Sequence, residues 1–346
     1  MMRNYQMMKH NIIIFVIGAI VLSSCAKAPE TNAGMAAKEY FDAWMYVNHP
    51  NLTPTPLGAY VLSETPGEGR LAGDIEAGPY VRVNFTATDL YGNIATSTYV
   101  DVNQQAGKYE ENSYYGPRIW CRIGDILYAG VDEAVSTMRV GGKKKSIIPG
   151  WLFAQKRYKT QEEYIKNVSS TNAIYDIELL EVIDDIEKWE IDSLSRFIDK
   201  NYPSKGSADS LKYGFYYIQN KAPKDTAHFP NDTTVYINYI GRTLDGKVFD
   251  TTIKDTAKFY GIYASSKTYE PMSINWNHDD YNDITMGDDN NSTIPGFSYA
   301  LWNMRSYESG RAVFYSGLGY GSSGTGNSIP EYAPLIFDIE FVDKEN

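Results

Sequence analysis

The chain of 346 residues is long enough for about two domains, and its 43% hydrophobic and 22% charged residues are typical of a globular protein. The formal net charge of −11 disfavours nucleic-acid binding, which needs a basic surface, so we expect no nucleic-acid partner. The two cysteines exclude a disulfide scaffold or a zinc ribbon, and four histidines are too few for a histidine-rich metal site.

The first residues have the pattern of an export signal. A basic start precedes an uncharged apolar run at 12–22, which is shorter than the ~20 residues needed to span a bilayer. The run ends in the sequence LSSC, and small residues before Cys25 resemble the lipobox of bacterial lipoproteins. By that resemblance, residues 1–24 are a signal peptide, Cys25 is lipidated, and the small polar stretch at 25–35 is a tether. The open alternative is an ordinary signal peptide followed by an incidental cysteine.

The rest of the chain contains the same order of motifs twice. A helical pattern around Phe41 precedes an alternating strand pattern at 80–88, and a helical pattern at 184–202 precedes a strand pattern at 235–239. Three matched pairs lie 154 to 162 residues apart: LGAY at 57–60 with YGFY at 213–216, VRVNF at 81–85 with VYINY at 235–239, and IYDIE at 174–178 with IFDIE at 336–340.

This repetition predicts two copies of one domain, at 36–184 and 185–346. Each copy is rich in strand patterns and has one short helix, expected near 132–138 in the first and 298–304 in the second. The expected fold class is therefore α+β with antiparallel sheets, and each copy has a helical lead-in.

The second copy resembles the FKBP-type peptidyl-prolyl isomerases over residues 235–343. Its opening reads VYINYIGRTLDGKVFDTT, its centre reads IPGFSYALWNM, and its end carries GYGSSG, then IP, then LIFDIEF. The resemblance implies a twisted antiparallel sheet wrapped around a short helix, and it implies isomerisation of X-Pro peptide bonds without a cofactor or a metal.

The resemblance also implies a cradle for the proline ring. The residues carried over to catalytic positions are Tyr239, Phe249, Asp250, Tyr320 and Phe337. Those carried over to substrate contact are Ile294, Phe297 and Ile329, with Met272 assigned to a further wall position. The family usually has tryptophan where Phe297 stands, so we expect a smaller aromatic floor. Asp250 is expected to orient Tyr239, and Tyr320 to hydrogen-bond a substrate carbonyl.

The first copy lacks part of this set. Alignment places Phe85 at Tyr239, Ala95 at Phe249 and Thr96 at Asp250, while Val131, Phe153 and Tyr175 fall at or near the other ring positions. The acid and one wall are therefore missing, and we expect no isomerase activity from this copy. Binding of unfolded chain and a purely structural role both remain open for it.

Two polar stretches complete the sequence predictions. The acidic stretch within 275–291 lacks the spacing of a calcium loop, so a solvated surface insertion is favoured over a calcium site. The lysine run at 143–145 is expected to be the solvated face of a strand.

The predicted function is X-Pro isomerisation on exported proteins at the cell envelope. The predicted partners are X-Pro segments of those proteins and the membrane, reached through a lipid on Cys25, with the protein in the outer membrane at its periplasmic or surface face. The alternative is a non-catalytic chaperone or assembly lipoprotein. A pure binder has no need of Asp250, so the pair Phe249 and Asp250 favours the enzyme.

Overall fold

The computed structural model describes residues 33–204, 211–276, 280–287 and 289–344. The predicted signal peptide and Cys25 lie outside these residues. Within the described ranges, no helix combines the length and the apolar character needed to cross a bilayer.

The N-terminal unit, residues 33–184, contains one antiparallel sheet. Its elements in chain order are α1 (Ala33–Asn48), β1 (Tyr60–Thr65), β2 (Tyr80–Thr88), β3 (Ile94–Ser97), α2 (Val100–Gln105), β4 (Arg118–Cys121), α3 (Ala129–Ser136), β5 (Lys143–Ile148), η1 (Gly150–Leu152), α4 (Gln161–Asn167) and β6 (Ala173–Ile183). The strand order is β1-β5-β6-β2-β3, and β4 also pairs with β2.

The C-terminal unit, residues 185–344, contains the second antiparallel sheet. Its elements are α5 (Ile186–Asn201), β7 (Phe215–Lys221), β8 (Thr233–Thr243), β9 (Val248–Thr251), α6 (Lys254–Phe259), β10 (Met272–Trp276), η2 (Tyr281–Asp283), β11 (Thr285–Met286), β12 (Asn291–Ser292), α7 (Pro295–Asn303), β13 (Ser309–Phe314), η3 (Ser316–Leu318) and β14 (Leu335–Val342). The strand order is β12-β11-β10-β8-β14-β13-β7, and β9 also pairs with β8.

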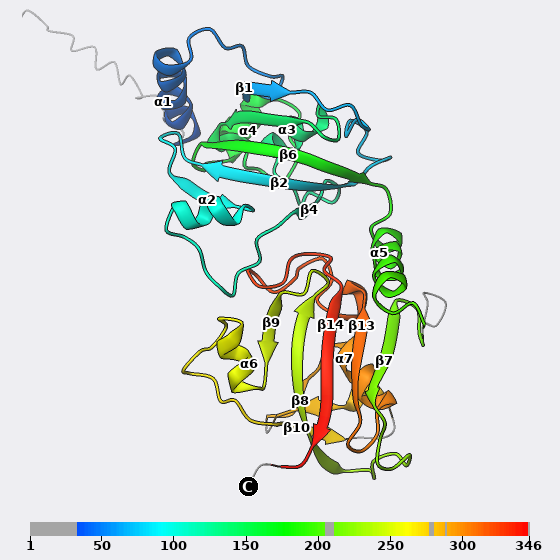
Figure 1. Ribbon diagram of the computed structural model, residues 1–346. Helices are drawn as coiled ribbons and strands as arrows, with labels where there is room; N and C mark the ends of the chain where they lie inside the picture. Colours follow the sequence, from blue (N-terminus) through cyan, green and yellow to red (C-terminus); the bar gives the residue numbers. More distant parts are fainter. Residues whose placement is uncertain (1–32, 205–210, 277–279, 288, 345–346) are drawn as a thin grey trace, which may run out of the picture.

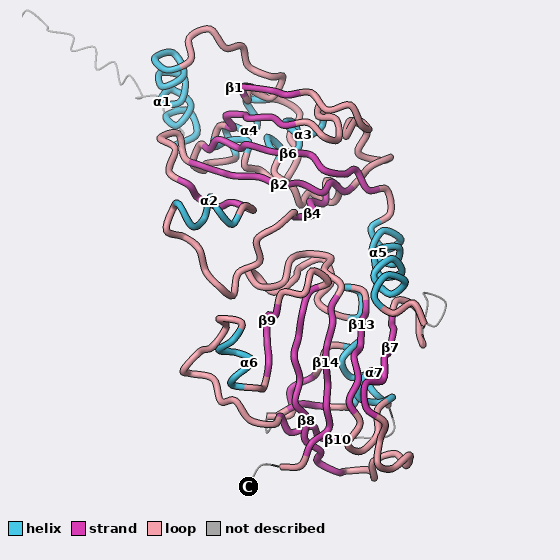
Figure 2. The backbone as a smooth tube through the Cα atoms, viewed as in Figure 1, coloured by secondary structure: helices cyan, strands magenta, loops and turns pink. Residues whose placement is uncertain are grey.

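The two sheets share one connectivity. The order β1-β5-β6-β2 in the first sheet corresponds to β7-β13-β14-β8 in the second. In the first sheet β2 also pairs with β3 and β4, and in the second sheet β8 also pairs with β9 and β10. Figure 1 shows the two units one above the other, with α5 joining them at one side, and Figure 2 shows that each is built mainly of strands and loops. The predicted α+β class with antiparallel sheets is confirmed.

The short helices begin earlier than the sequence patterns predict. α3 spans Ala129–Ser136 and α7 spans Pro295–Asn303, against expected positions of 132–138 and 298–304. Pro295 explains the start of α7, because proline fits the first helical position, where its missing N–H costs no hydrogen bond. Each helix packs into its own core: Val131 and Val135 in the first, Ala300 and Leu301 in the second.

The stretch at 275–291 adds strands to the second sheet. β11 pairs with β10, and β12 pairs with β11, so part of the predicted insertion extends the sheet beyond β10. Within the described residues, no group of three or more histidine, cysteine or acidic side chains is arranged to hold a metal ion. Residues 277–279 and 288, which belong to the acidic stretch, lie outside the described residues.

The expectation that 143–145 is a solvated strand face is wrong for Lys144. Lys144 is 2% exposed, and its Nζ donates to the Ala134 carbonyl and to Thr137 Oγ1 and pairs with Glu64 at 3.2 Å. The last carbonyls of a helix lack partners within the helix, and a cation there satisfies them. Alternation places Lys144 on the inner face of β5, where the end of α3 supplies these acceptors.

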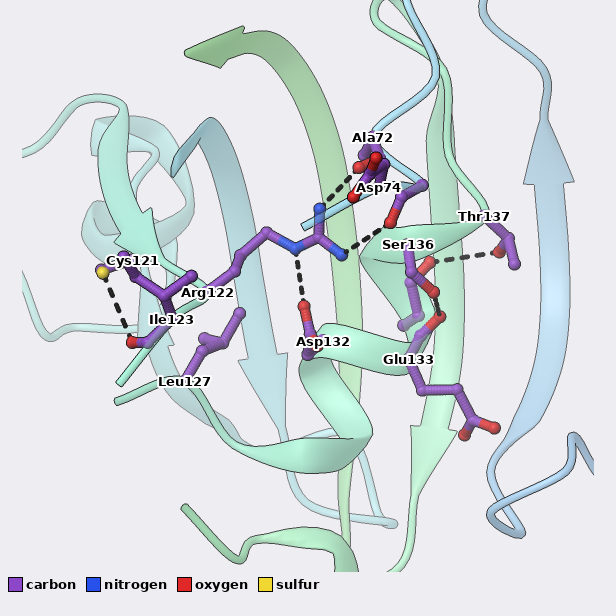
Figure 3. Close-up of polar contacts among 12 residues, drawn as sticks. Ala72, Asp74, Cys121, Arg122, Ile123, Leu127, Asp132, Glu133, Ser136 and Thr137 are labelled. Carbon is purple, nitrogen blue, oxygen red and sulfur yellow. Dashed lines mark hydrogen bonds and ion pairs between the residues drawn. The ribbon is translucent and has the colours of Figure 1, made fainter. Parts of the chain in front are cut away.

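A second buried cation holds the start of α3. Arg122 is 2% exposed, and its Nε donates to Asp132 Oδ1 at 2.6 Å while its Nη1 donates to the Ala72 carbonyl at 2.6 Å (Figure 3). A buried guanidinium is tolerated when its donors are satisfied in this way. Sequence reasoning did not identify this pair, which joins the chain after β4 to the first turn of α3.

Helix α5 is attached to both units. Trp189 Nε1 donates to Glu181 Oε1 of β6 at 3.0 Å, and Glu190 accepts from both the backbone N–H and the hydroxyl of Ser316 at 2.7 Å. On the same helix, Leu194 and Ile198 are fully buried against the second sheet. Glu190 is itself 2% exposed, and this burial raises the pKa of its carboxyl to about 7.

This raised pKa predicts a pH-dependent stability. The folded state holds the proton on Glu190 up to about pH 7, whereas the unfolded chain releases it near 4.5, the ordinary pKa of a glutamate carboxyl. The unfolded state therefore binds fewer protons between these values, and the free energy of unfolding falls as pH rises from 4.5 to 7. We expect this contribution to be about 3 kcal/mol at most. Glu190→Gln should remove this pH-dependent contribution, because glutamine does not titrate. The free energy of unfolding of the wild type minus that of the variant should therefore fall by about 3 kcal/mol between pH 4.5 and 8, as measured by urea denaturation. A difference that stays constant over this range would contradict the prediction.

Candidate functional site

A cluster of aromatic rings occupies the centre of the second core. The Phe337 ring on β14 lies 4.9 Å from that of Phe297 on α7, 5.7 Å from Phe249 on β9 and 6.1 Å from Tyr239 on β8, measured between ring centroids. The Phe314 ring stacks on Phe337 from β13 at 5.8 Å. The structure thus brings together four of the residues predicted from the family resemblance.

Gly241 permits the Phe249 ring to lie across the sheet. Position 241 pairs with Asp250 on β9, and a Cβ atom at 241 would lie 2.6 Å from Phe249 Cε2 and 3.1 Å from Phe337 Cε1. Real Cβ atoms do not approach ring carbons as closely as 2.6 Å, so a side chain here would displace Phe249. A glycine in a strand interior commonly marks such a close approach.

Asp250 lies beside this cluster and accepts hydrogen bonds from several groups. The Tyr239 hydroxyl donates to Asp250 Oδ2 at 2.6 Å, and the Thr251 N–H donates to Oδ1 at 2.9 Å. Lys267 forms an ion pair with the same Oδ1. Sequence reasoning did not identify Lys267, because it lies in the stretch after residue 252 where the family pattern could not be followed.

The two tyrosines of the site remain protonated at neutral pH. Burial, together with the negative charge of Asp250, raises the pKa of Tyr239 far above its usual value. Burial and the same charge also raise the pKa of Tyr320. The Tyr239 hydroxyl donates its hydrogen bond to Asp250, whereas the Tyr320 hydroxyl keeps a proton that it can donate.

The remaining predicted residues surround the rings to different extents. Ile294 precedes α7, and Ile329 and Tyr320 belong to the loop at 319–334; Ile329 is buried, and all three pack against the second core. Met272 begins β10 and pairs with Ile237, and it packs against the second core. It also lines a hollow with Glu270 and Lys344.

The N-terminal unit has the same backbone arrangement as the site but lacks its acidic side chain. Phe85 N–H donates to Thr98 Oγ1 at 2.9 Å, as Tyr239 N–H donates to Thr252 Oγ1 at 3.0 Å. The matched threonines are 154 residues apart, and the same offset places Thr96 at Asp250. The first unit therefore has no carboxylate at this position.

Its rings nevertheless line a hollow. Phe85 stacks on Tyr175 at 5.8 Å and lies 4.9 Å from Trp120. These three rings and Val131 line a space of about 430 Å³, which is also bounded by Tyr332 of the C-terminal unit. The hollow has the size of a small ligand site, and its lining is mainly apolar.

Comparison with known proteins finds a family model that is similar to the second unit. Residues 226–342 match the family model described as FKBP-type peptidyl-prolyl cis-trans isomerase. This match covers the ring cluster and Asp250. The C-terminal unit, which contains this match, is called the FKBP-type domain below.

Individual relatives of the FKBP-type domain are distant. The chain is 29% identical over 109 residues to peptidyl-prolyl cis-trans isomerase FKBP11 of Bos taurus, covering 32% of this chain and 41% of that protein. It is 23% identical over 273 residues to peptidyl-prolyl cis-trans isomerase FKBP10 of Homo sapiens, covering 79% of this chain and 35% of that protein. The chain thus spans less than half the length of these relatives.

A solved structure of the three FKBP domains of wheat FKBP73 aligns with 82% of this chain and 94% of its own, at 16% identity and a TM-score of 0.28.

The ring cluster predicts a large stability cost for Phe337→Ala. This side chain is 5% exposed and contacts rings from several elements, so its removal should lower the free energy of unfolding by about 3–5 kcal/mol. Phe337→Leu keeps most of the apolar volume and should cost clearly less. Urea denaturation monitored by tryptophan fluorescence measures both. Equal costs for the two variants, or a cost below about 1 kcal/mol for alanine, would contradict the packing described here.

Proposed function

We propose that the protein is a peptidyl-prolyl cis-trans isomerase whose activity resides in the FKBP-type domain. The observation that carries the proposal is the Tyr239–Asp250 hydrogen bond beside the ring cluster of Phe249, Phe297 and Phe337. These are the residues that the family resemblance assigns to the proline cradle, and they lie within the segment that matches the family model.

The chemistry of the reaction fits apolar walls better than acid–base groups. Rotation about a peptide bond has a barrier of about 18–20 kcal/mol because resonance gives the C–N bond partial double-bond character, and the same resonance makes the planar amide polar. An X-Pro bond consequently isomerises in tens to hundreds of seconds without a catalyst. Surroundings that exclude water favour the twisted amide, whose carbonyl is less polar, and each 1.36 kcal/mol of barrier removed gives a tenfold faster rate.

The polar groups have a positioning role in this mechanism. Asp250 holds the Tyr239 hydroxyl, and Lys267 and the Thr251 N–H hold Asp250. Tyr320 is half-buried and protonated, so its hydroxyl can donate to a substrate carbonyl. No step requires a nucleophile or a proton transfer.

This proposal predicts activity that depends on Asp250 but not on its counterpart in the first unit. We expect Asp250→Asn and Phe249→Ala, each in the full chain, to lower kcat/KM on a proline tetrapeptide about tenfold, with folding checked by circular dichroism. Thr96→Ala changes the equivalent position of the N-terminal unit and is the matched control, which should keep the wild-type rate. An inactive wild type, or an Asp250→Asn variant as active as the wild type, would refute the proposal.

We also propose that the protein works at the cell envelope on exported proteins, anchored by a lipid on Cys25. The support is the apolar run at 12–22 and the sequence LSSC ending at Cys25. Lipid chains bind a membrane with about 0.8 kcal/mol per buried CH₂, so several chains on one cysteine give a stable anchor.

The anchor predicts a change in fractionation. Cys25→Ala, expressed in a bacterial host that processes lipoproteins, should move the protein from the membrane pellet to the soluble fraction, because it removes the acylated thiol. Ser24→Thr, a change in the residue before the cysteine, is a milder control that retains the thiol. Retention of Cys25→Ala in the pellet would contradict lipid anchoring.

A second candidate function is the binding of unfolded polypeptide by the N-terminal unit. The observation that favours it is the hollow of about 430 Å³ lined by Phe85, Trp120 and Tyr175. An Asp250→Asn chain that still suppresses aggregation of an unfolded protein, and loses this ability with Trp120→Ala, would support binding as a separate activity.

A further inference from the structure

One segment of the N-terminal unit reaches the FKBP-type domain. It comprises residues 108–118, between α2 and the start of β4, and is called the bridging segment below. In Figure 1 the chain after α2 descends toward the other unit and returns to β4. Its contacts fall on parts of the FKBP-type domain that carry or adjoin the predicted cradle.

The first set of contacts holds the loop at 319–334. Arg118 Nε donates to Glu331 Oε2 at 2.9 Å, and its Nη2 donates to Glu331 Oε1 at 2.7 Å, so the pair is bidentate. Tyr114 N–H donates to the Asn327 carbonyl at 2.6 Å. The side chains of Arg118 and Glu331 are 23% and 30% exposed, so the pair is largely shielded from water.

A second set of contacts holds the chain around β9. Lys247, which lies in the turn two residues before Phe249, donates from Nζ to the Glu111 carbonyl at 3.0 Å and to the Ser113 carbonyl. The Glu111 side chain also lies against Gly261, which follows α6: a Cβ atom at 261 would lie 2.4 Å from Glu111 Cγ.

The loop at 319–334 is rich in glycine, and the contacts from the bridging segment add to its internal hydrogen bonds. It contains glycines at 319, 321, 324 and 326, and glycine loses more backbone freedom on ordering than any other residue. Its internal bonds include Thr325 N–H to the Ile329 carbonyl and Tyr332 N–H to the Gly321 carbonyl, both 2.9 Å. Tyr320 and Ile329, two predicted cradle residues, are carried by this loop.

We propose that the bridging segment is a positioning device for the proline cradle, and that Arg118 is its principal positioning residue. The inference rests on the proposed isomerase function. The bidentate pair fixes the loop that carries Tyr320 and Ile329, while Lys247 fixes the turn that leads to Phe249 and Asp250. One segment of the N-terminal unit thereby fixes the positions of two walls of the cradle relative to each other: the loop with Tyr320 and Ile329, and the strand with Phe249. Preorganising a site in this way removes the cost of ordering it when substrate binds.

The test is a charge exchange in the full chain. Arg118→Glu places two carboxylates opposite each other, and Glu331→Arg places two guanidinium groups opposite each other. Each single variant should lower kcat/KM on a proline tetrapeptide about fivefold and speed hydrogen exchange of amides in 319–334 about tenfold, because the loop opens more often. The double variant restores opposite charges and should recover both quantities to within about twofold of the wild type.

The control and the contrary outcomes separate positioning from general stability. Lys221→Glu breaks the exposed pair between Lys221 and Glu340, on strands β7 and β14, and should change neither quantity. Lys247→Met removes the second set of contacts and should act in the same direction as Arg118→Glu. Faster loop exchange with unchanged activity would overturn the positioning role, and unchanged exchange in both single variants would overturn the support of the loop. A wild type without any activity would overturn the proposed function itself. This outcome is distinguishable from failure of the positioning role, in which the wild type is active and the variants keep its rate.

Discussion

The packing of rings around Phe337 is the interaction on which the FKBP-type domain depends. Phe337 lies on the central strand β14, and its neighbours come from β8, β9, β13 and α7. The Phe337 side chain therefore contacts the main strands of the sheet, the short strand β9 and the helix α7 that packs on the sheet. The same rings form the walls of the proposed cradle, so the core and the site are not separate parts of this domain.

The two units show how one backbone supports different chemistry. In the first unit Thr98 accepts a hydrogen bond from the Phe85 N–H, and in the second unit Thr252 accepts one from the Tyr239 N–H. The strand order is also shared. In the first unit, Thr96 stands where the acid would be and Ala95 where the ring would be. Both lie exposed on the short strand β3, so the first core does not depend on either side chain. In the proposed positioning mechanism, the contacts between the units give the first unit a role that does not depend on a cradle of its own.

Local patterns predicted the fold better than they predicted the polar contacts. The strand at 80–88 and the antiparallel α+β class follow from alternation and order, because these signals lie within short stretches of sequence. The family resemblance, but not local patterning, places Tyr239 and Phe337 in one cluster, and the structure brings their rings together. Lys144, Lys267 and the bidentate pair at Arg118 could not, since each depends on which distant acceptor the folded chain brings opposite the cation.

Adjacent residues of α5 hold different units, and this has a mechanical consequence. Trp189 is bonded to the first sheet and Glu190 to the start of η3 in the second, with no flexible linker between them. A rotation of one unit about the helix axis would strain one of these bonds. Helix α5 therefore couples the orientation of the two units, and this coupling reaches the base of the glycine-rich loop that begins after Leu318.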